Sequence, residues 1–385
     1  MNDLELPPLD ESSKCRSALL KKVVLEKIEN EGGWISFSRF MELALYYPEL
    51  GYYSGGHVRI GRGGDFITAP KISKLFGMTL AYQFEEILKT NQSACILELG
   101  AGDGSGAVDI VRELQHLNCL PKSYLILEIS PHLIELQRKT LHSEVPEIFK
   151  IFHWIKELPE NLEGIIFANE VFDALPVNLI EVVQSEIFEK GVIVDNNQLA
   201  WDKRPAVRKI REMAFSLNLA PPYTTEIAHI AELLIKKLAS IIKMGLILII
   251  DYGFKASEYY HPQRYEGTLM CHYKHYAHQN PFIFLGHQDI TSHVNFTSLA
   301  RVAEKSGLNL LGFCSQAQFL LNSGIVRLLS REFTQSARSD LLNAKNVNKL
   351  LSPSEMGELF KVLALGKNIS SQLVGFSDRN RINTL

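Results

Sequence analysis

Apolar residues along the first two thirds of the chain follow two alternating patterns. Helical spacing predicts helices over residues 17–29, 40–46, 74–88, 108–114 and 131–141. Short continuous apolar runs predict buried strands over 95–99, 124–128, 164–168 and 245–251, with a further short strand over 149–153. Strands that alternate with helices in this way indicate an α/β fold built on a doubly wound, mostly parallel sheet.

A different pattern interrupts this alternation. Residues 179–184, 187–194 and 199–202 alternate between apolar and polar positions, as antiparallel strands do, and Asn196-Asn197 stands where a tight hairpin turn is expected. A long helix is predicted over 226–243. Residues 1–13 are expected to form a polar tail, and residues 47–70 a long turn-rich loop with many Gly and aromatic residues.

Composition narrows the class of protein. The 385 residues are 46% hydrophobic and 22% charged, with a net charge of −3, which gives no electrostatic case for a nucleic-acid partner. No apolar run is long enough to span a membrane. The N-terminus resembles neither a signal nor a transit peptide, so we expect a cytoplasmic, bacterial-type protein. Five scattered cysteines without a C-x-x-C pair favour reduced thiols and no metal site.

The most informative motif is a run of alternating glycines between a predicted strand and a predicted helix. Such a loop is a cradle for a nucleotide-like cofactor. It fits the dinucleotide fingerprint of an NAD-dependent oxidoreductase, and it also fits the acidic-x-G-x-G-x-G pattern of S-adenosylmethionine enzymes. Glu98 and Asp103 favour the second, because they would repel a pyrophosphate, whereas Glu98 would face the methionine end of a sulfonium cofactor. The glycines are Gly100, Gly102, Gly104 and Gly106.

Two further strand ends carry polar residues. Glu128 ends the 124–128 strand, where a carboxylate suits the two hydroxyls of an adenosine ribose, and Ile129 beside it is assigned to the same cofactor-binding set. Asn169 ends the 164–168 strand and could contact the cofactor or orient a methyl acceptor. Glu170 and Asp173 follow, one helical turn apart, as a carboxylate pair that could bind a guanidinium; a helix N-cap is the alternative explanation for the pair.

Half of the twelve histidines lie in residues 261–293. His272, His275 and His278 have helix-like spacing, but without accompanying Cys or carboxylate ligands we expect a solvated, substrate-facing loop rather than a metal site. His287, beside Gln288-Asp289, is the best candidate for a general base.

Several stretches together resemble the MidA family of S-adenosylmethionine-dependent methyltransferases, which is related to a mitochondrial complex I assembly factor. The resemblance covers about residues 34–366, in the family's order. It rests on Gly64–Pro70, Glu98–Gly104, Ala168–Pro176, Ile250–Gly253, Gly267–Leu269, Gln288–Phe296 and Gln316–Leu320. Asn295 departs from the family pattern, which has Asp there.

The resemblance implies a class I methyltransferase (Rossmann-like) domain, S-adenosylmethionine as cofactor, and methylation of an arginine in a partner protein. In the mitochondrial branch that partner is a subunit of respiratory complex I. It also implies that the 65–70 loop covers the cofactor, which adds Asp65 and Thr68 to the cofactor-binding set, and that 267–296 is a substrate-side insertion.

These expectations define a domain organisation and leave two alternative functions open. We expect an N-terminal helical region with a cofactor-covering loop (1–92), a methyltransferase domain (93–366) with insertions at about 176–225 and 255–296, and a C-terminal tail (367–385). An NAD-dependent oxidoreductase is one alternative. A non-catalytic assembly chaperone that binds its partner through the insertions is the other, and a homodimer is left open.

Overall fold

The computed structural model describes residues 6–56, 68–333, 337–369 and 372–385. The chain divides into two compact units. The central-sheet unit comprises residues 67–172, 232–255 and 294–385, and the antiparallel unit comprises residues 1–66, 173–231 and 256–293.

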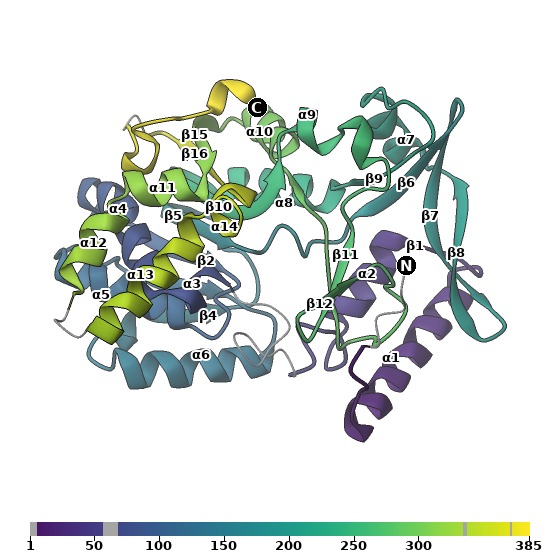
Figure 1. Cartoon of the computed structure of the whole chain (residues 1–385), viewed down its shortest axis with the longest axis horizontal. Helices are drawn as coiled ribbons and strands as arrows, with labels where there is room; N and C mark the ends of the chain where they lie inside the picture. Colours follow the sequence, from purple (N-terminus) through teal and green to yellow (C-terminus); the bar gives the residue numbers. More distant parts are fainter. Residues whose placement is uncertain (1–5, 57–67, 334–336, 370–371) are drawn as a thin grey trace. The chain divides into compact units, whose positions relative to one another are not determined.

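A mostly parallel sheet forms the central-sheet unit (Figure 1). Its strand order is β15-β16-β10-β5-β2-β3-β4, with β14 paired beside β10. The strands from β10 to β4 are parallel, and β16 is antiparallel to both of its neighbours. The bounds are β2 Cys95–Leu99, β3 Tyr124–Leu127, β4 Phe152–Ile155, β5 Leu162–Asn169, β10 Ile242–Phe254, β14 Val294–Asn295, β15 Asn309–Ser315 and β16 Phe360–Lys367.

The strand order reverses between β2 and β5. Strands β3 and β4 continue the sheet on one side of β2, and β5 and β10 continue it on the other. This is the topological switch point of a doubly wound sheet, so the predicted fold class is confirmed.

Helices accompany this sheet. They are α3 Ala69–Ile72, α4 Lys74–Thr90, α5 Ser105–His116, α6 Pro131–Glu144, α8 His229–Ile241, α10 Phe296–Lys305, α11 Gln316–Asn322, α12 Ile325–Arg331, α13 Ala337–Leu351 and α14 Met356–Leu359, with the short 3-10 turns η1 Phe149–Ile151, η3 Val374–Phe376 and η4 Ile382–Thr384. None of the helices in the described residues combines enough length and apolar character to cross a bilayer.

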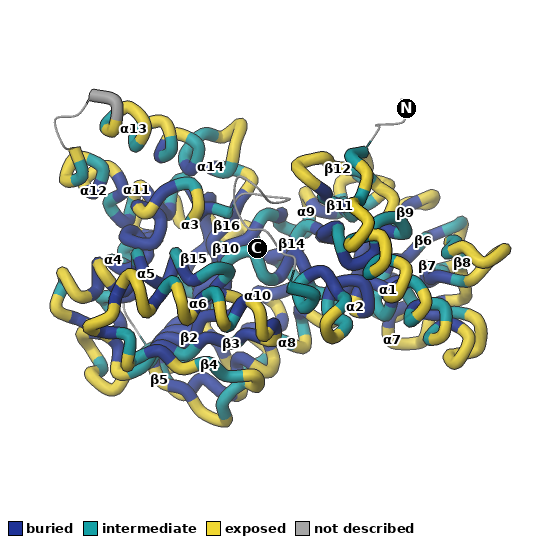
Figure 2. Tube along the Cα trace, turned by 90° about the horizontal axis from the view of Figure 1, so that it is seen from below, coloured by how far each residue is buried: buried dark blue, intermediate teal, exposed yellow. Residues whose placement is uncertain are grey.

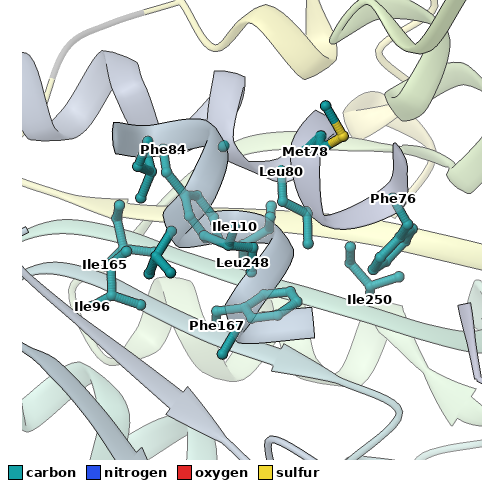
Figure 3. Packing of buried hydrophobic residues seen from close by; sticks show 14 of the residues in the cluster. Phe76, Met78, Leu80, Phe84, Ile96, Ile110, Ile165, Phe167, Leu248 and Ile250 are labelled. Atoms are coloured by element: carbon teal, nitrogen blue, oxygen red, sulfur yellow. The ribbon is translucent and has the colours of Figure 1, made fainter. Parts of the chain in front are cut away.

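The main core lies between the sheet and the helices α4 and α5 (Figure 3). Phe84 of α4 meets Phe167 of β5 edge to face, with ring centroids 5.7 Å apart, and Ile110 of α5 belongs to the same cluster. The alternate β5 residues Ile166 and Ala168 are also buried, so the sheet is covered on both faces. The inner strands of the sheet are accordingly dark blue in Figure 2.

Residues 372–385, predicted as part of a C-terminal tail, pack against this unit. Phe376 is buried in the main core. The Gly375 N–H donates to Gln83 Oε1 at 3.0 Å, and Asn322 Nδ2 donates to the Gly375 carbonyl at the same distance.

The antiparallel unit holds two small sheets. The first has the order β1-β7-β6-β9, with β8 on β7, and the second has the order β12-β11-β13. The predicted hairpin is confirmed, because Asn196 and Asn197 join β7 to β8 with φ of 46° and 61°. The elements are α1 Glu11–Asn30, β1 Ile35–Ser36, α2 Phe37–Tyr46, β6 Asn178–Val183, β7 Glu186–Asp195, β8 Gln198–Pro205, α7 Arg208–Phe215, β9 Tyr223–Ile227, α9 Ala256–Tyr259, η2 Pro262–Arg264, β11 Met270–Tyr273, β12 Tyr276–His278 and β13 Asp289–Thr291.

Three local predictions are wrong in extent. The long helix over 226–243 is three elements, because β9 ends at Ile227, α8 covers His229–Ile241 and β10 begins at Ile242. Buried Glu226 belongs to β9, where it accepts the N–H groups of Thr268 and Leu269. The polar tail 1–13 already includes the start of α1. The strand expected over 149–153 is η1 followed by β4.

The histidine-rich stretch is not helical. His272 and His278 lie on the strands β11 and β12 of a hairpin, and Lys274 and His275 take positive φ at its turn. The expectation of a solvated loop is also wrong in part, because Cys271 in this stretch is fully buried, as are Gln288 and Asp289 beside His287.

Candidate cofactor and acceptor site

The carboxyl ends of three neighbouring strands define the candidate site. β2 pairs in parallel with both β3 and β5, so the residues that follow Leu99, Leu127 and Ala168 emerge at one edge of the sheet. Ligands of open α/β sheets bind at this edge beside the switch point.

The glycine loop that follows β2 requires its glycines. Gly100, Gly102 and Gly104 have φ of 65°, 56° and 85°, values that residues with a Cβ rarely adopt. Gly104 is the N-cap of α5, and a Cβ there would lie 3.3 Å from the Cα of Gln137. The predicted strand, glycine loop and helix are therefore present, with the loop leading into the N-terminus of α5.

The carboxyl groups of the two acidic residues beside the loop both have hydrogen-bond or ion-pair partners. Asp103 forms an ion pair with Lys71 of α3 and accepts hydrogen bonds from the backbone and hydroxyl of Ser105. Glu98 is 5% exposed and accepts the Tyr124 hydroxyl at 2.8 Å. Burial raises the pKa of Glu98 to about 7. The charge argument against a dinucleotide is thus weaker in the folded protein than in the sequence, since neither group is a bare anion.

Glu128 follows β3, and its carboxylate accepts hydrogen bonds from backbone N–H groups and from a side-chain amide. Its Oε1 accepts the Ser130 N–H at 2.9 Å, and its Oε2 accepts Gln137 Nε2 at 3.1 Å. Burial raises its pKa, while these hydrogen bonds lower it. The next residue, Ile129, is 49% exposed. A fixed carboxylate beside an exposed apolar side chain fits a ribose and an adenine ring.

Asn169 and Glu170 come together at the end of β5. Asn169 Nδ2 and the Ala69 N–H both donate to Glu170 Oε1, at 2.9 and 3.2 Å. Asn169 Oδ1 is buried and has no hydrogen-bond partner among the described residues. A buried acceptor without a donor is unfavourable, so this oxygen fits a bound N–H group.

Asp173 is not placed as expected. Residues 171–175 form a turn instead of a helix, and Glu170 has a φ of 53°, so the prediction that one helical turn aligns the two carboxylates is wrong. Asp173 belongs to the antiparallel unit, where it is buried and its carbonyl accepts the Ser292 N–H at 2.9 Å. Thr68 precedes α3 as its N-cap residue. Asp65 lies outside the described residues.

Two buried residues near the site have roles that the sequence did not indicate. Asp251 lies within β10, which continues to Phe254, and its carboxylate accepts the N–H groups of Val171 and Phe172. Gln137, in the interior of α6, bonds to both Glu128 and the glycine loop. No motif marks a single glutamine in a helix, so no sequence signal could have found it.

Metal ligands do not gather in the part of the chain that the structure describes. No group of three or more His, Cys, Asp or Glu side chains there could hold an ion.

The switch point, the glycine loop and the polar strand ends are those of a Rossmann-like domain that binds a nucleotide-like cofactor, the fold class to which class I methyltransferases belong. Residues 79–314 match the sequence model of the family described as "Putative S-adenosyl-L-methionine-dependent methyltransferase", and the chain belongs to this family.

Relatives and solved structures agree with this assignment. The structure resembles that of a protein from Burkholderia thailandensis solved with bound S-adenosyl-homocysteine, at 38% identity, with a TM-score of 0.96 and coverage of 99% of this chain and 100% of that one. A mouse protein named mitochondrial protein arginine methyltransferase NDUFAF7 is 30% identical, over 89% of this chain and 83% of its own. Its Drosophila melanogaster homolog is 28% identical, over 96% and 92%. The protein is therefore an S-adenosylmethionine-dependent methyltransferase, which displaces the NAD-dependent alternative.

Proposed function

We propose that this enzyme methylates an arginine side chain of a partner protein. The observation that carries the proposal is the acceptor-rich end of β5, where the unpartnered Asn169 Oδ1 lies beside the Glu170 carboxylate. A guanidinium presents only N–H donors, in a planar fork that carboxylates and carbonyls match. The relatives named protein arginine methyltransferases support the same acceptor.

When bound, the cofactor would supply an electrophilic methyl group; a guanidinium nitrogen would take this group as the carbon–sulfur bond breaks, and the proton that it loses would pass to the Glu170 carboxylate or to water. The chain's residues have to hold the acceptor in line and localise its electrons on one nitrogen. Glu170 is assigned to this role, with Asn169 as the acceptor of a second N–H. Asp173, which belongs to the antiparallel unit, is left out of this assignment.

The residues that we assign to cofactor binding lie at the same edge of the sheet. We assign the turn from Gly100 to Gly104 as the floor of the pocket, with Glu98 near the methionine end. Glu128 is assigned to the ribose hydroxyls and Ile129 to the adenine. Thr68 and Asp65 are proposed to belong to a covering segment, as the family resemblance implies.

The test separates cofactor binding from transfer. We expect Glu170→Gln to bind S-adenosyl-homocysteine within about threefold of the wild type, because glutamine keeps an acceptor at the Oε1 position. Its transfer rate should fall about a hundredfold or more, because the negative charge is lost. Isothermal titration and transfer of a labelled methyl group to host lysate measure the two quantities. Glu163→Gln, on the exposed opposite end of β5, is the matched control.

Other outcomes would contradict particular parts of the proposal. Severe loss of S-adenosyl-homocysteine affinity in Glu170→Gln would mean that Glu170 contributes to cofactor binding and not to binding of the methyl acceptor. Labelled protein without methylarginine on mass spectrometry would overturn the acceptor class. Donor binding by the wild type without any labelled protein would favour the assembly chaperone. A complex I subunit as the acceptor stays a prediction, which comparison of peptides from a knockout and its parent would test.

A further inference from the structure

Gln137 is a buried side chain whose polar atoms all have partners at the cofactor edge. It lies on α6 and is fully buried. Its Nε2 donates to the Gly102 carbonyl at 2.9 Å and to Glu128 Oε2 at 3.1 Å, while its Oε1 accepts Trp154 Nε1 at 2.8 Å. One amide therefore links the loop after β2, the residue after β3 and a residue of β4.

The backbone around Gln137 is packed as closely as its side chain. A Cβ at Gly104 would lie 3.3 Å from the Gln137 Cα, closer than most Cβ contacts, and the φ of 85° there already favours a glycine where the loop approaches α6. The hydrogen bond to the Gly102 carbonyl fixes the orientation of a peptide group in a left-handed, conformationally permissive segment. Gln137 thus sets the position of the loop relative to Glu128.

We infer that Gln137 is a positioning residue for the cofactor's ribose: it holds the Glu128 carboxylate and the glycine loop in one fixed arrangement. The inference rests on the proposed assignment of Glu128 to the ribose hydroxyls. It concerns cofactor binding alone, so it does not depend on which protein or side chain is methylated.

The physical reason is the burial of Glu128. An ionised carboxylate away from water needs donors, and it must be ionised to accept hydrogen bonds from two hydroxyls. The Ser130 N–H, Gln137 and the Ile129 N–H lower the pKa of Glu128 against the effect of burial. Arg138, the charged neighbour on α6, lies over the Trp154 ring at 4.8 Å. Gln137 is thus the side-chain donor to Glu128 among the described residues.

The experiment compares two buried glutamines. Gln137→Met keeps the length of the side chain and removes its hydrogen bonds. Gln83→Met is the matched control, because Gln83 is equally buried in the same unit but bonds to Glu86 and Gly375 instead. Isothermal titration with S-adenosyl-homocysteine and with its 2′-deoxy and 3′-deoxy analogues gives the contribution of each ribose hydroxyl in each variant. Thermal melting checks that each variant is folded.

We expect Gln137→Met to weaken S-adenosyl-homocysteine binding about tenfold, since hydrogen bonds to a charged group are lost. Binding of each deoxy analogue should be weakened less, because one of the two hydroxyls whose hydrogen bonds Glu128 would accept is already absent from it. The loss of S-adenosyl-homocysteine affinity in Gln137→Met should also be larger at about pH 5.5 than at about pH 8, because loss of a hydrogen-bond donor raises the pKa of Glu128. Gln83→Met should lower the melting temperature without changing the hydroxyl dependence.

Glu128→Gln separates the ways in which the inference can fail. Suppose that Glu128→Gln lowers the affinity for S-adenosyl-homocysteine, but that Gln137→Met lowers the affinities for S-adenosyl-homocysteine and both deoxy analogues equally or not at all. Gln137 then does not act through Glu128, and the inference is wrong. If Glu128→Gln binds S-adenosyl-homocysteine as the wild type does, the ribose assignment is wrong and the inference is lost with it. Neither result bears on arginine as the acceptor, which the labelling experiment tests.

Discussion

Asp251 is the residue whose removal should disturb the acceptor edge without touching the cofactor edge. Its side chain is 0% exposed and accepts three backbone N–H groups: Val171 at 3.2 Å, Phe172 at 2.9 Å and Tyr252 at 2.9 Å. The first two belong to the turn that directly follows Glu170. Asp251 therefore stabilises the conformation that presents Glu170, although it is not itself assigned a contact with the substrate.

The magnitude follows from the geometry of Asp251→Asn. The amide keeps one oxygen, so it satisfies either the Val171 and Phe172 donors or the Tyr252 donor, and its NH2 group faces the remaining donor. One buried N–H without an acceptor costs about 1–3 kcal/mol, and the remaining bonds lose their charge assistance. We expect the free energy of unfolding of the central-sheet unit to fall by about 3–5 kcal/mol.

The functional loss should be selective. A small displacement of Glu170 should lower the transfer rate about a hundredfold, because catalysis by positioning is sensitive to shifts of about 1 Å. S-adenosyl-homocysteine affinity should change little. Urea unfolding, isothermal titration and single-turnover transfer measure the three quantities. Asp378→Asn, whose side chain is 72% exposed in the same unit, is the control and should stay within about 0.5 kcal/mol. A loss of stability below about 1 kcal/mol in Asp251→Asn would refute the reasoning.

Two further predictions concern the glycine loop and its neighbour. Gly102→Val should abolish measurable S-adenosyl-homocysteine binding in isothermal titration, because a β-branched residue is strained at a φ of 56°; an affinity within tenfold of the wild type would contradict this. For Glu98, the folded-state pKa of about 7 lies above the ordinary value of 4.5, so the stability that it contributes is complete below about pH 4.5 and is lost as the pH rises through about 7. This loss amounts to about 3 kcal/mol in urea unfolding and should be absent in Glu98→Gln; parallel pH profiles for the two proteins would show that Glu98 does not titrate in this range.

Much of the central sheet was predictable because its strands are continuous apolar runs. The prediction for 95–99 coincides with β2, and the prediction for 164–168 lies within β5. The glycine loop was predictable for a related reason, since three of its residues need a backbone conformation that glycine adopts without strain.

The remaining features depend on contacts distant in sequence. Glu226 looks like the start of a helix in its local sequence, but its backbone pairs with Leu179 of β6, and its side chain accepts the N–H groups of Thr268 and Leu269, more than forty residues away. Asp103 has no cationic neighbour in the local sequence, but in the folded chain it forms an ion pair with Lys71. Local periodicity carries no information about either partner.

The position of β16 has a consequence for how the protein is made. Residues 360–367 supply a strand that lies between β10 and β15 and pairs with both (Figure 1). During synthesis, β15 leaves the ribosome before the strand that holds it to the sheet has been translated. The exposed edges of β10 and β15 must then wait for the chain to reach residue 367, an interval in which unpaired strands are prone to wrong association. We therefore expect nascent chains stalled before residue 360 to be protease-sensitive and to need chaperones, even though the whole glycine loop has already been synthesised.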